Sequence, residues 1–268
     1  MYESKNFGIE VEFTGVTRET VIKHFELFFR RKSICEHKIL KDNSEYDKYM
    51  IQDDDGLVWT LNRDRSLVAE IFTPDFEIKS VNEEDVDGLY KCELVSPVLN
   101  AKSVGTLCSL VDIIKSLGGI VNDSCGIHVH IDKPDSVDEV LDLIQKFTAI
   151  QTYIFEDFQV KENRLLKYCK PYPQSFINGL SVYDINTFED LRDYVQRHLG
   201  GDYPLTHSHN ISRYYALNLH SLVMHNTIEF RFFNGSLDTK EIKRILDWVL
   251  HFSYSPEKYE DYSDKLGL

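Results

Sequence analysis

The sequence has no long apolar run, no glycine-rich phosphate loop and no internal repeat. None of its hydrophobic stretches approaches the ~20 residues that span a bilayer. Residues 1–6 lack the basic-then-apolar layout of a secretory signal. Neither common glycine-rich phosphate motif occurs, which argues against the P-loop and dinucleotide-binding folds. The sequence therefore predicts a chain with no membrane span and no secretory leader.

Cysteine pairs and excess positive charge are also missing. The five cysteines are scattered, odd in number and without C-x-x-C spacing, which argues against a disulfide framework and a thiolate zinc site. We expect reduced thiols and a cytoplasmic protein. The formal net charge is −14, with 44 acidic against 30 basic residues, and this argues against general nucleic-acid binding through a basic face. Neither nucleic acid nor a membrane is an expected partner.

What is present indicates a folded globular chain. Its 268 residues are 42% hydrophobic, enough for a sizeable core. Apolar stripes at helical spacing predict helices near 21–29, 104–117, 136–150, 187–199 and 238–252. The helix after Ser136 opens with a capping box to Glu139. Strand patterns lie at 7–13, 57–61, 67–72, 89–95, 126–132, 214–219 and 227–233.

The order of these elements decides the expected fold class. Strands and helices do not alternate strictly, which favours an α+β fold with a curved, largely antiparallel sheet and helices packed on one face. We expect one domain over 1–268, with loop insertions near 42–55, 161–186 and 200–212. The acidic segment 42–55 is expected at the surface, while irregular segments such as 161–186 and 200–212 often form lids or substrate walls, although variable surface loops look the same in a sequence.

Three of the predicted strands carry reactive side chains on one face. Alternate residues of a strand point to opposite faces. Each of these strands therefore has apolar residues on one face and a pair of chemically active residues on the other. These pairs are Glu10 and Glu12, His128 and His130, and Glu229 and Arg231. If the strands share a sheet, its polar face suits a metal and phosphate site. Taken singly, each strand also fits a half-buried strand with a solvated face.

Other candidates keep two interpretations. Glu93 is a further carboxylate, or only the end of a strand before Ser96-Pro97. Asp64 and Ser66 fit a plain turn between strands or a substrate contact. Arg213 is a candidate for a phosphate or a substrate carboxylate, or a partner for a surface carboxylate. His207 and His209 repeat the His-x-His spacing in a polar loop, where the flanking residues do not alternate.

The order of these motifs resembles the amidoligase family, compact relatives of glutamine synthetase and glutamate–cysteine ligase. The matching segments run through almost the whole chain: Phe-Gly-Ile-Glu-Val-Glu-Phe at 7–13, Trp-x4-Asp-x-Ser at 59–66, Glu-Leu-Val-Ser-Pro at 93–97, Cys-Gly-Ile-His-Val-His-Ile-Asp at 125–132, Arg-Tyr-Tyr-Ala-Leu-Asn-Leu at 213–219 and Thr-Ile-Glu-Phe-Arg-Phe-Phe-Asn-Gly at 227–235. The resemblance implies a glutamine-synthetase-like catalytic fold and ATP-dependent joining of a carboxylate to an amine through an acyl-phosphate. Relatives of this fold often form homo-oligomers.

The resemblance also implies roles for single residues, with Mg²⁺, or Mn²⁺ in its place, as the metal. Glu12 and Glu93 would serve one ion, and Glu10, His128 and Glu229 another. His130 would approach a nucleotide phosphate and Arg231 the phosphoryl group in transfer. We assign Arg213 and Asp64 to catalysis beside Arg231, and Ser66 to the cofactor site beside His130 and Arg231. The chemistry agrees, because hard Mg²⁺ prefers carboxylate oxygens and phosphoryl transfer needs cations beside crowded anionic oxygens.

Two other functions remain open at this point. A metal-dependent hydrolase could use the His-x-His strand, and a catalytically silent binding module could keep the same fold. A test of ATP binding distinguishes the hydrolase from a ligase, because a ligase should bind ATP with magnesium and a hydrolase would not need it. The substrates are expected to be a small-molecule or peptide carboxylate and an amine. An amino acid, a polyamine, a peptide and a cell-wall fragment all fit.

Overall fold

The computed structural model describes residues 5–39, 45–81 and 84–254. By its internal contacts the chain falls into two compact units. Of the described residues, the first unit contains those of 5–127 together with Asn234–Leu246, and the second contains His128–Phe233 and residues 247–254. The expectation of a single domain stays a prediction. Within the described ranges, an eight-stranded sheet has the order β2-β3-β4-β7-β1-β8-β10-β9, and β5 pairs with β6 separately.

The first unit has five neighbouring antiparallel strands, joined in the order β2-β3-β4-β7-β1. Their bounds are β1 Phe7–Phe13, β2 Ile34–Ile39, β3 Glu45–Gln52, β4 Val58–Arg63 and β7 Cys92–Val95. The short strands β5 Glu70–Phe72 and β6 Ile78–Ser80 form a hairpin beside helix α2, Glu84–Tyr90. Antiparallel pairing of this extent confirms the α+β class with a large antiparallel sheet.

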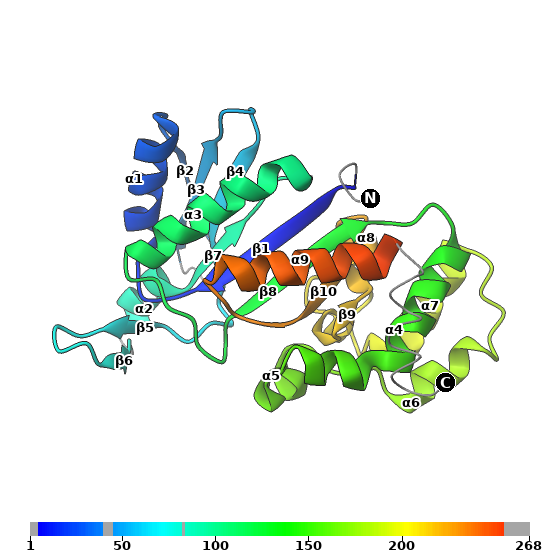
Figure 1. The fold of residues 1–268 in the computed structure, drawn as a ribbon. Helices are drawn as coiled ribbons and strands as arrows, with labels where there is room; N and C mark the ends of the chain where they lie inside the picture. Colours follow the sequence, from blue (N-terminus) through cyan, green and yellow to red (C-terminus); the bar gives the residue numbers. More distant parts are fainter. Residues whose placement is uncertain (1–4, 40–44, 82–83, 255–268) are drawn as a thin grey trace. The chain divides into compact units, whose positions relative to one another are not determined.

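Two helices build the core of the first unit. Helix α1, Arg18–Phe29, begins at Thr17, whose side chain accepts the Thr20 amide, and it buries Val21 and Phe25. Helix α3, Val104–Ser116, follows the short 3-10 helix η1, Ala101–Ser103. Figure 1 shows α1 and α3 beside the strands of this unit, and α1 contacts both α3 and β3. The apolar stripes of the sequence are therefore the buried faces of these helices, as predicted.

The second unit is mostly helical. The long helix α4, Val137–Asp157, has the predicted capping box between Ser136 and Glu139. Its Phe147 ring lies 6.4 Å from that of Phe230 and 5.9 Å from that of Phe232, between ring centroids, so α4 covers the apolar face of β10. The other elements are α5 Glu162–Lys167, α6 Gln174–Leu180, α7 Phe188–Leu199, η2 Ile211–Tyr214, β9 Leu217–Asn218 and α8 His220–Met224.

Three elements run through both units. Strand β8, Gly126–Asp132, has its first two residues in the first unit and the rest in the second. Strand β10, Thr227–Asn234, belongs to the second unit except for its last residue, which is in the first. Helix α9, Thr239–Tyr254, starts in the first unit and ends in the second. The helix expected after Asp238 is thus present. None of the five cysteines is paired in a disulfide, and Cys35 alone among them is exposed.

Several expectations about loops and strand ends are wrong. Residues 45–52, expected in a loop, form β3, since this polar segment pairs with a strand on each side; residues 40–44 lie outside the described ranges. Tyr46, Tyr49 and Ile51 are residue types enriched in strands, and pairing on both edges supplies the hydrogen bonds of β3. The segment 161–186 contains helices α5 and α6. Leu89 belongs to α2 rather than to a strand, and residues 67–69 and 214–216 are not part of β5 or β9.

Candidate active site

Three carboxylates lie together on β1 and β7 of the first unit. In the antiparallel register of these strands, Glu12 is directly opposite Glu93. Directly opposed side chains have Cβ atoms about 4.5–5.5 Å apart, and like charges in that position are destabilising. Glu10 is two residues along β1 from Glu12. The strand pairing therefore concentrates negative charge, an arrangement that a cation would stabilise.

Glu12 is held in place from a third strand. Its side chain is only 2% exposed, and its Oε2 accepts the backbone N–H of Gly126 at 2.5 Å. Gly126 is the first residue of β8, so this bond ties β1 to the start of the strand that carries the two histidines. A charge-assisted bond to a backbone amide fixes the carboxylate's direction.

The environment of Glu93 disfavours its charged form. Burial, followed by the negative charges of Glu10, Asp64 and Glu12, raises the pKa of Glu93 well above its usual range, while a hydrogen bond from Asn62 acts the other way. Asn62 is opposite Glu93 on the neighbouring strand β4. Desolvation and like charges are the two ordinary causes of such a shift. A divalent ion would supply the compensating charge.

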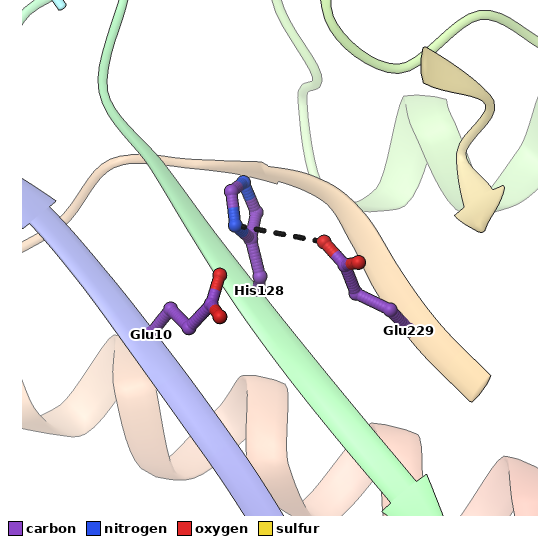
Figure 2. A group of neighbouring side chains, drawn as sticks. All are labelled: Glu10, His128 and Glu229. Atoms are coloured by element: carbon purple, nitrogen blue, oxygen red, sulfur yellow. Dashed lines mark ion pairs between the residues drawn. The ribbon is translucent and has the colours of Figure 1, made fainter. Parts of the chain in front are cut away.

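In the second unit, Glu229 is at the centre of a buried polar cluster. Arg231 Nη1 donates to Glu229 Oε1 at 2.6 Å, and Asn218 Nδ2 donates to Oε2 at 2.5 Å. His128 Nδ1 lies 3.6 Å from Oε1, the pair drawn with a dashed line in Figure 2. The exposed fractions of His128, Glu229 and Arg231 are 2%, 4% and 8%. The alternative of strands with a solvated polar face is wrong for these residues.

Arg231 is oriented by helix α5 and the residue after it. Its Nε donates to the carbonyl oxygen of Tyr168 at 3.2 Å, and Arg164 Nη2 donates to the Arg231 carbonyl at 3.2 Å. Arg164 is itself buried, with its guanidinium 5.7 Å from the centroid of the Tyr168 ring. The guanidinium of Arg231 is thus held at two of its edges, with Glu229 on one and a carbonyl on the other.

His130 is two residues beyond His128 on β8 and has hydroxyl partners. Its Nδ1 lies 3.0 Å from Thr227 Oγ1 and 3.4 Å from Ser221 Oγ, which are 2.7 Å from each other. Ser221 is on α8, and Thr227 begins β10. This network sets the ring orientation of His130.

Among the described residues, two sets of side chains could hold a metal ion. The first is Glu10, His128 and Glu229, drawn in Figure 2, and the second is Glu12, Glu93 and His128. Within each set, one ligand atom from each residue lies within 4.8 Å of the others. His128 belongs to both sets, and carboxylates outnumber imidazoles in each. Their donor chemistry suits a hard divalent cation.

A family model described as "Putative amidoligase enzyme" matches residues 3–253. The chain belongs to the amidoligase family. The match covers nearly the whole sequence, and the description indicates a ligase-type enzyme. No curated protein matches the chain.

The structure places the other predicted site residues of this amidoligase-family chain in a turn after β4 and on the short 3-10 helix η2. Asp64 Oδ1 accepts the Ser66 amide at 2.7 Å, so the two form the turn that follows β4. The charge of Asp64 still contributes to the raised pKa of Glu93. Arg213 is on η2, where its Nη1 donates to the Ser208 carbonyl at 2.9 Å. Catalytic and cofactor roles for Asp64, Ser66 and Arg213 stay predictions.

Three residues of the buried cluster were missed from the sequence. The sequence gives one hint for Asn218, because it lies in a predicted strand. The structure pairs that strand with β10 and places Asn218 opposite Glu229. Arg164 and the carbonyl of Tyr168 carry no such signal, since they lie in a segment expected to be irregular. Among the helices of the described ranges, none has both the length and the apolar composition needed to cross a membrane.

Proposed function

We propose that this amidoligase-family chain is an ATP- and Mg²⁺-dependent ligase that joins a carboxylate to an amine through an acyl-phosphate. One observation carries the proposal: Arg231, Glu229 and His128 lie next to one another in a buried cluster. Together with nearby carboxylates, the cluster offers two possible sets of metal ligands. A glutamine-synthetase-like arrangement of the sheet is part of the same proposal.

The residues present fit magnesium. Glu10, His128 and Glu229 would hold one ion, and Glu12 and Glu93, with His128 within reach, the other. The raised pKa of Glu93 supports this, because a carboxylate surrounded by like charges gains most from a bound cation. Bound Mg²⁺ would offset the negative charge of the phosphate oxygens. Mn²⁺ has similar ligand preferences and would replace it.

The chain's own cations act where negative charge develops. Arg231 has a planar fork that suits a phosphoryl group, and its bonds to Glu229 and the Tyr168 carbonyl set the direction of that fork. His130, oriented by Thr227, would contact a nucleotide phosphate. Ser66 would contact the nucleotide. The guanidinium of Arg213 would pair with the substrate carboxylate, and the carboxylate of Asp64 with the substrate amine.

The covalent chemistry needs two displacements. A substrate carboxylate oxygen attacks the γ-phosphorus of ATP, and ADP leaves. The amine then attacks the acyl carbon, the C–O bond to phosphate breaks, and phosphate leaves as the nitrogen loses its proton. A carboxylate is a poor electrophile until it has such a leaving group, which explains the need for ATP. The substrates would be small molecules or peptides.

The test begins with binding. Calorimetry with a non-hydrolysable ATP analogue should show affinity that depends on Mg²⁺ or Mn²⁺, and co-crystals should show which residues contact the phosphates. ADP release would then be measured over a panel of carboxylates and amines, each omitted in turn. Absence of metal-dependent nucleotide binding contradicts the proposal, and amide or ester hydrolysis without nucleotide would establish the hydrolase instead.

A further inference from the structure

The second unit contains a cavity of about 290 Å³ that the proposed ligase chemistry does not use. It lies among α7, α8 and the end of β8, elements labelled in Figure 1. Most of its lining is aliphatic: Leu191, Val195, Leu205, Leu219, Leu222 and Val223. Ligand pockets are typically apolar cavities of roughly 300–1,000 Å³ with a few placed polar groups. The size and lining fit a small apolar ligand.

One cation among the lining residues gives the cavity a polar end. Lys133 directly follows the last residue of β8 and is half-buried. Its ammonium lies 3.8 Å from the centroid of the Phe188 ring, which also lines the cavity. A lysine can lay its methylene groups along an apolar surface with its ammonium over a ring face. This arrangement is stable, and the ammonium can still bind an anion.

The other charges in the lining do not oppose this. Arg192 Nη2 pairs with Glu189 Oε1 at 3.1 Å, three residues apart on α7. Arg192 Nε also lies 3.8 Å from Asp193 Oδ1. The carboxylate of Glu189 therefore has its own cation on the same helix, and Lys133 adds a positive charge to a mostly aliphatic wall.

We propose that this cavity binds a small amphiphilic monocarboxylate, with its hydrocarbon chain among the leucines and valines and its carboxylate against the ammonium of Lys133. At about 30 Å³ for each water-sized group, the volume holds roughly ten non-hydrogen atoms, which is the size of a medium-chain fatty acid. The site does not depend on the proposed ligase activity, because its lining residues lie outside the two candidate metal-ligand sets.

Octanoate is the probe, with octan-1-ol as its neutral analogue. Calorimetry on the full chain without nucleotide or metal should show octanoate binding at least tenfold tighter than octan-1-ol. Lys133→Met keeps the length of the side chain and removes its charge. It should weaken octanoate about tenfold and leave octan-1-ol unchanged. Lys167→Met, at an exposed position on α5, is the matched control and should change neither affinity.

A second variant tests the cavity itself. Val223→Phe fills the space beside α8 and should weaken both probes. Thermal unfolding of each variant shows whether it is folded, and Lys133→Met alone decides the proposal if Val223→Phe does not fold. The proposal is overturned if octanoate does not bind the wild-type chain, if the acid and the alcohol bind equally, or if Lys133→Met and Lys167→Met give the same affinity.

Discussion

Arg231 and Glu229 form an ion pair of 2.6 Å between side chains that are both buried, two residues apart on β10. The resemblance implies a phosphate contact for Arg231, while a guanidinium two residues from a carboxylate on one strand could also simply pair with Glu229. That pair is present and buried, where breaking it typically costs about 3–5 kcal/mol, whereas exposed pairs contribute about 0–1 kcal/mol. A structural and a catalytic role for Arg231 must therefore be separated by measuring turnover and stability together.

Arg231→Lys retains the positive charge but loses the planar fork and the Nε bond to the Tyr168 carbonyl. We expect nearly normal ATP binding and a turnover lowered by roughly 10²–10³, the usual effect of removing a preorganised donor. ADP release per folded molecule is the measurement. The control is Arg244→Lys, at an exposed pair with Glu241 on α9. If the lysine variant is less stable but turns over fully, Arg231 has only a structural role.

Glu12→Gln removes one anionic ligand while keeping an oxygen that can accept the Gly126 amide. Metal-dependent nucleotide binding should weaken about tenfold or more, without loss of the folded state. Magnesium and manganese should support binding and zinc should not support turnover, since carboxylates dominate the candidate sets. Calorimetry with each metal checks this, with the exposed Glu77→Gln as control. Equal affinities for the two variants would remove Glu12 from the metal site.

Glu93→Gln should make the metal-free protein more stable at neutral pH. The folded-state pKa of Glu93 is raised, so the folded chain binds more protons than the unfolded chain between the ordinary carboxyl pKa and the raised one. Stability therefore falls as pH rises through that window, and glutamine removes the penalty. Urea unfolding in EDTA should show a gain of about 1–3 kcal/mol at pH 8 that disappears near pH 4.

Glu93→Gln should also abolish the stabilisation of the folded chain by bound metal. Mg²⁺ should raise the unfolding midpoint of the wild-type chain and release protons at pH values below the raised pKa of Glu93, because the ligand must be deprotonated. Glu93→Gln should show neither effect. A variant that is less stable than wild type in EDTA at pH 8 would mean that Glu93 is held mainly by favourable hydrogen bonds.

Asp53→Asn should destabilise the first unit by about 1–3 kcal/mol. The buried carboxylate of Asp53 accepts the Asp55 and Leu57 amides on Oδ1 and the Trp59 indole N–H on Oδ2. Asparagine has one acceptor oxygen and must leave one of these groups unsatisfied. Urea unfolding followed by tryptophan fluorescence measures the loss, and Asp54→Asn at the exposed neighbouring position should change little.

Local patterns in the sequence were sufficient for much of the fold. The alternation in β1, β8 and β10 predicted which residues share a face, and the Ser136–Glu139 box predicted where α4 begins. These features depend on residues only a few positions apart, so a linear pattern contains them. The same alternation led to Glu10, Glu12, His128, Glu229 and Arg231 as one candidate group.

Only the tertiary structure decided which of these side chains lose contact with water and what holds them. The hydrogen bond that orients Glu12 comes from Gly126, more than a hundred residues away, and Arg231 is held by Arg164 and the Tyr168 carbonyl. The polar segment of β3 is a strand because two partners supply its hydrogen bonds. The physical reason is the same in each case: strand pairing, register and desolvation are set by residues far apart in the chain, and the local pattern does not contain them.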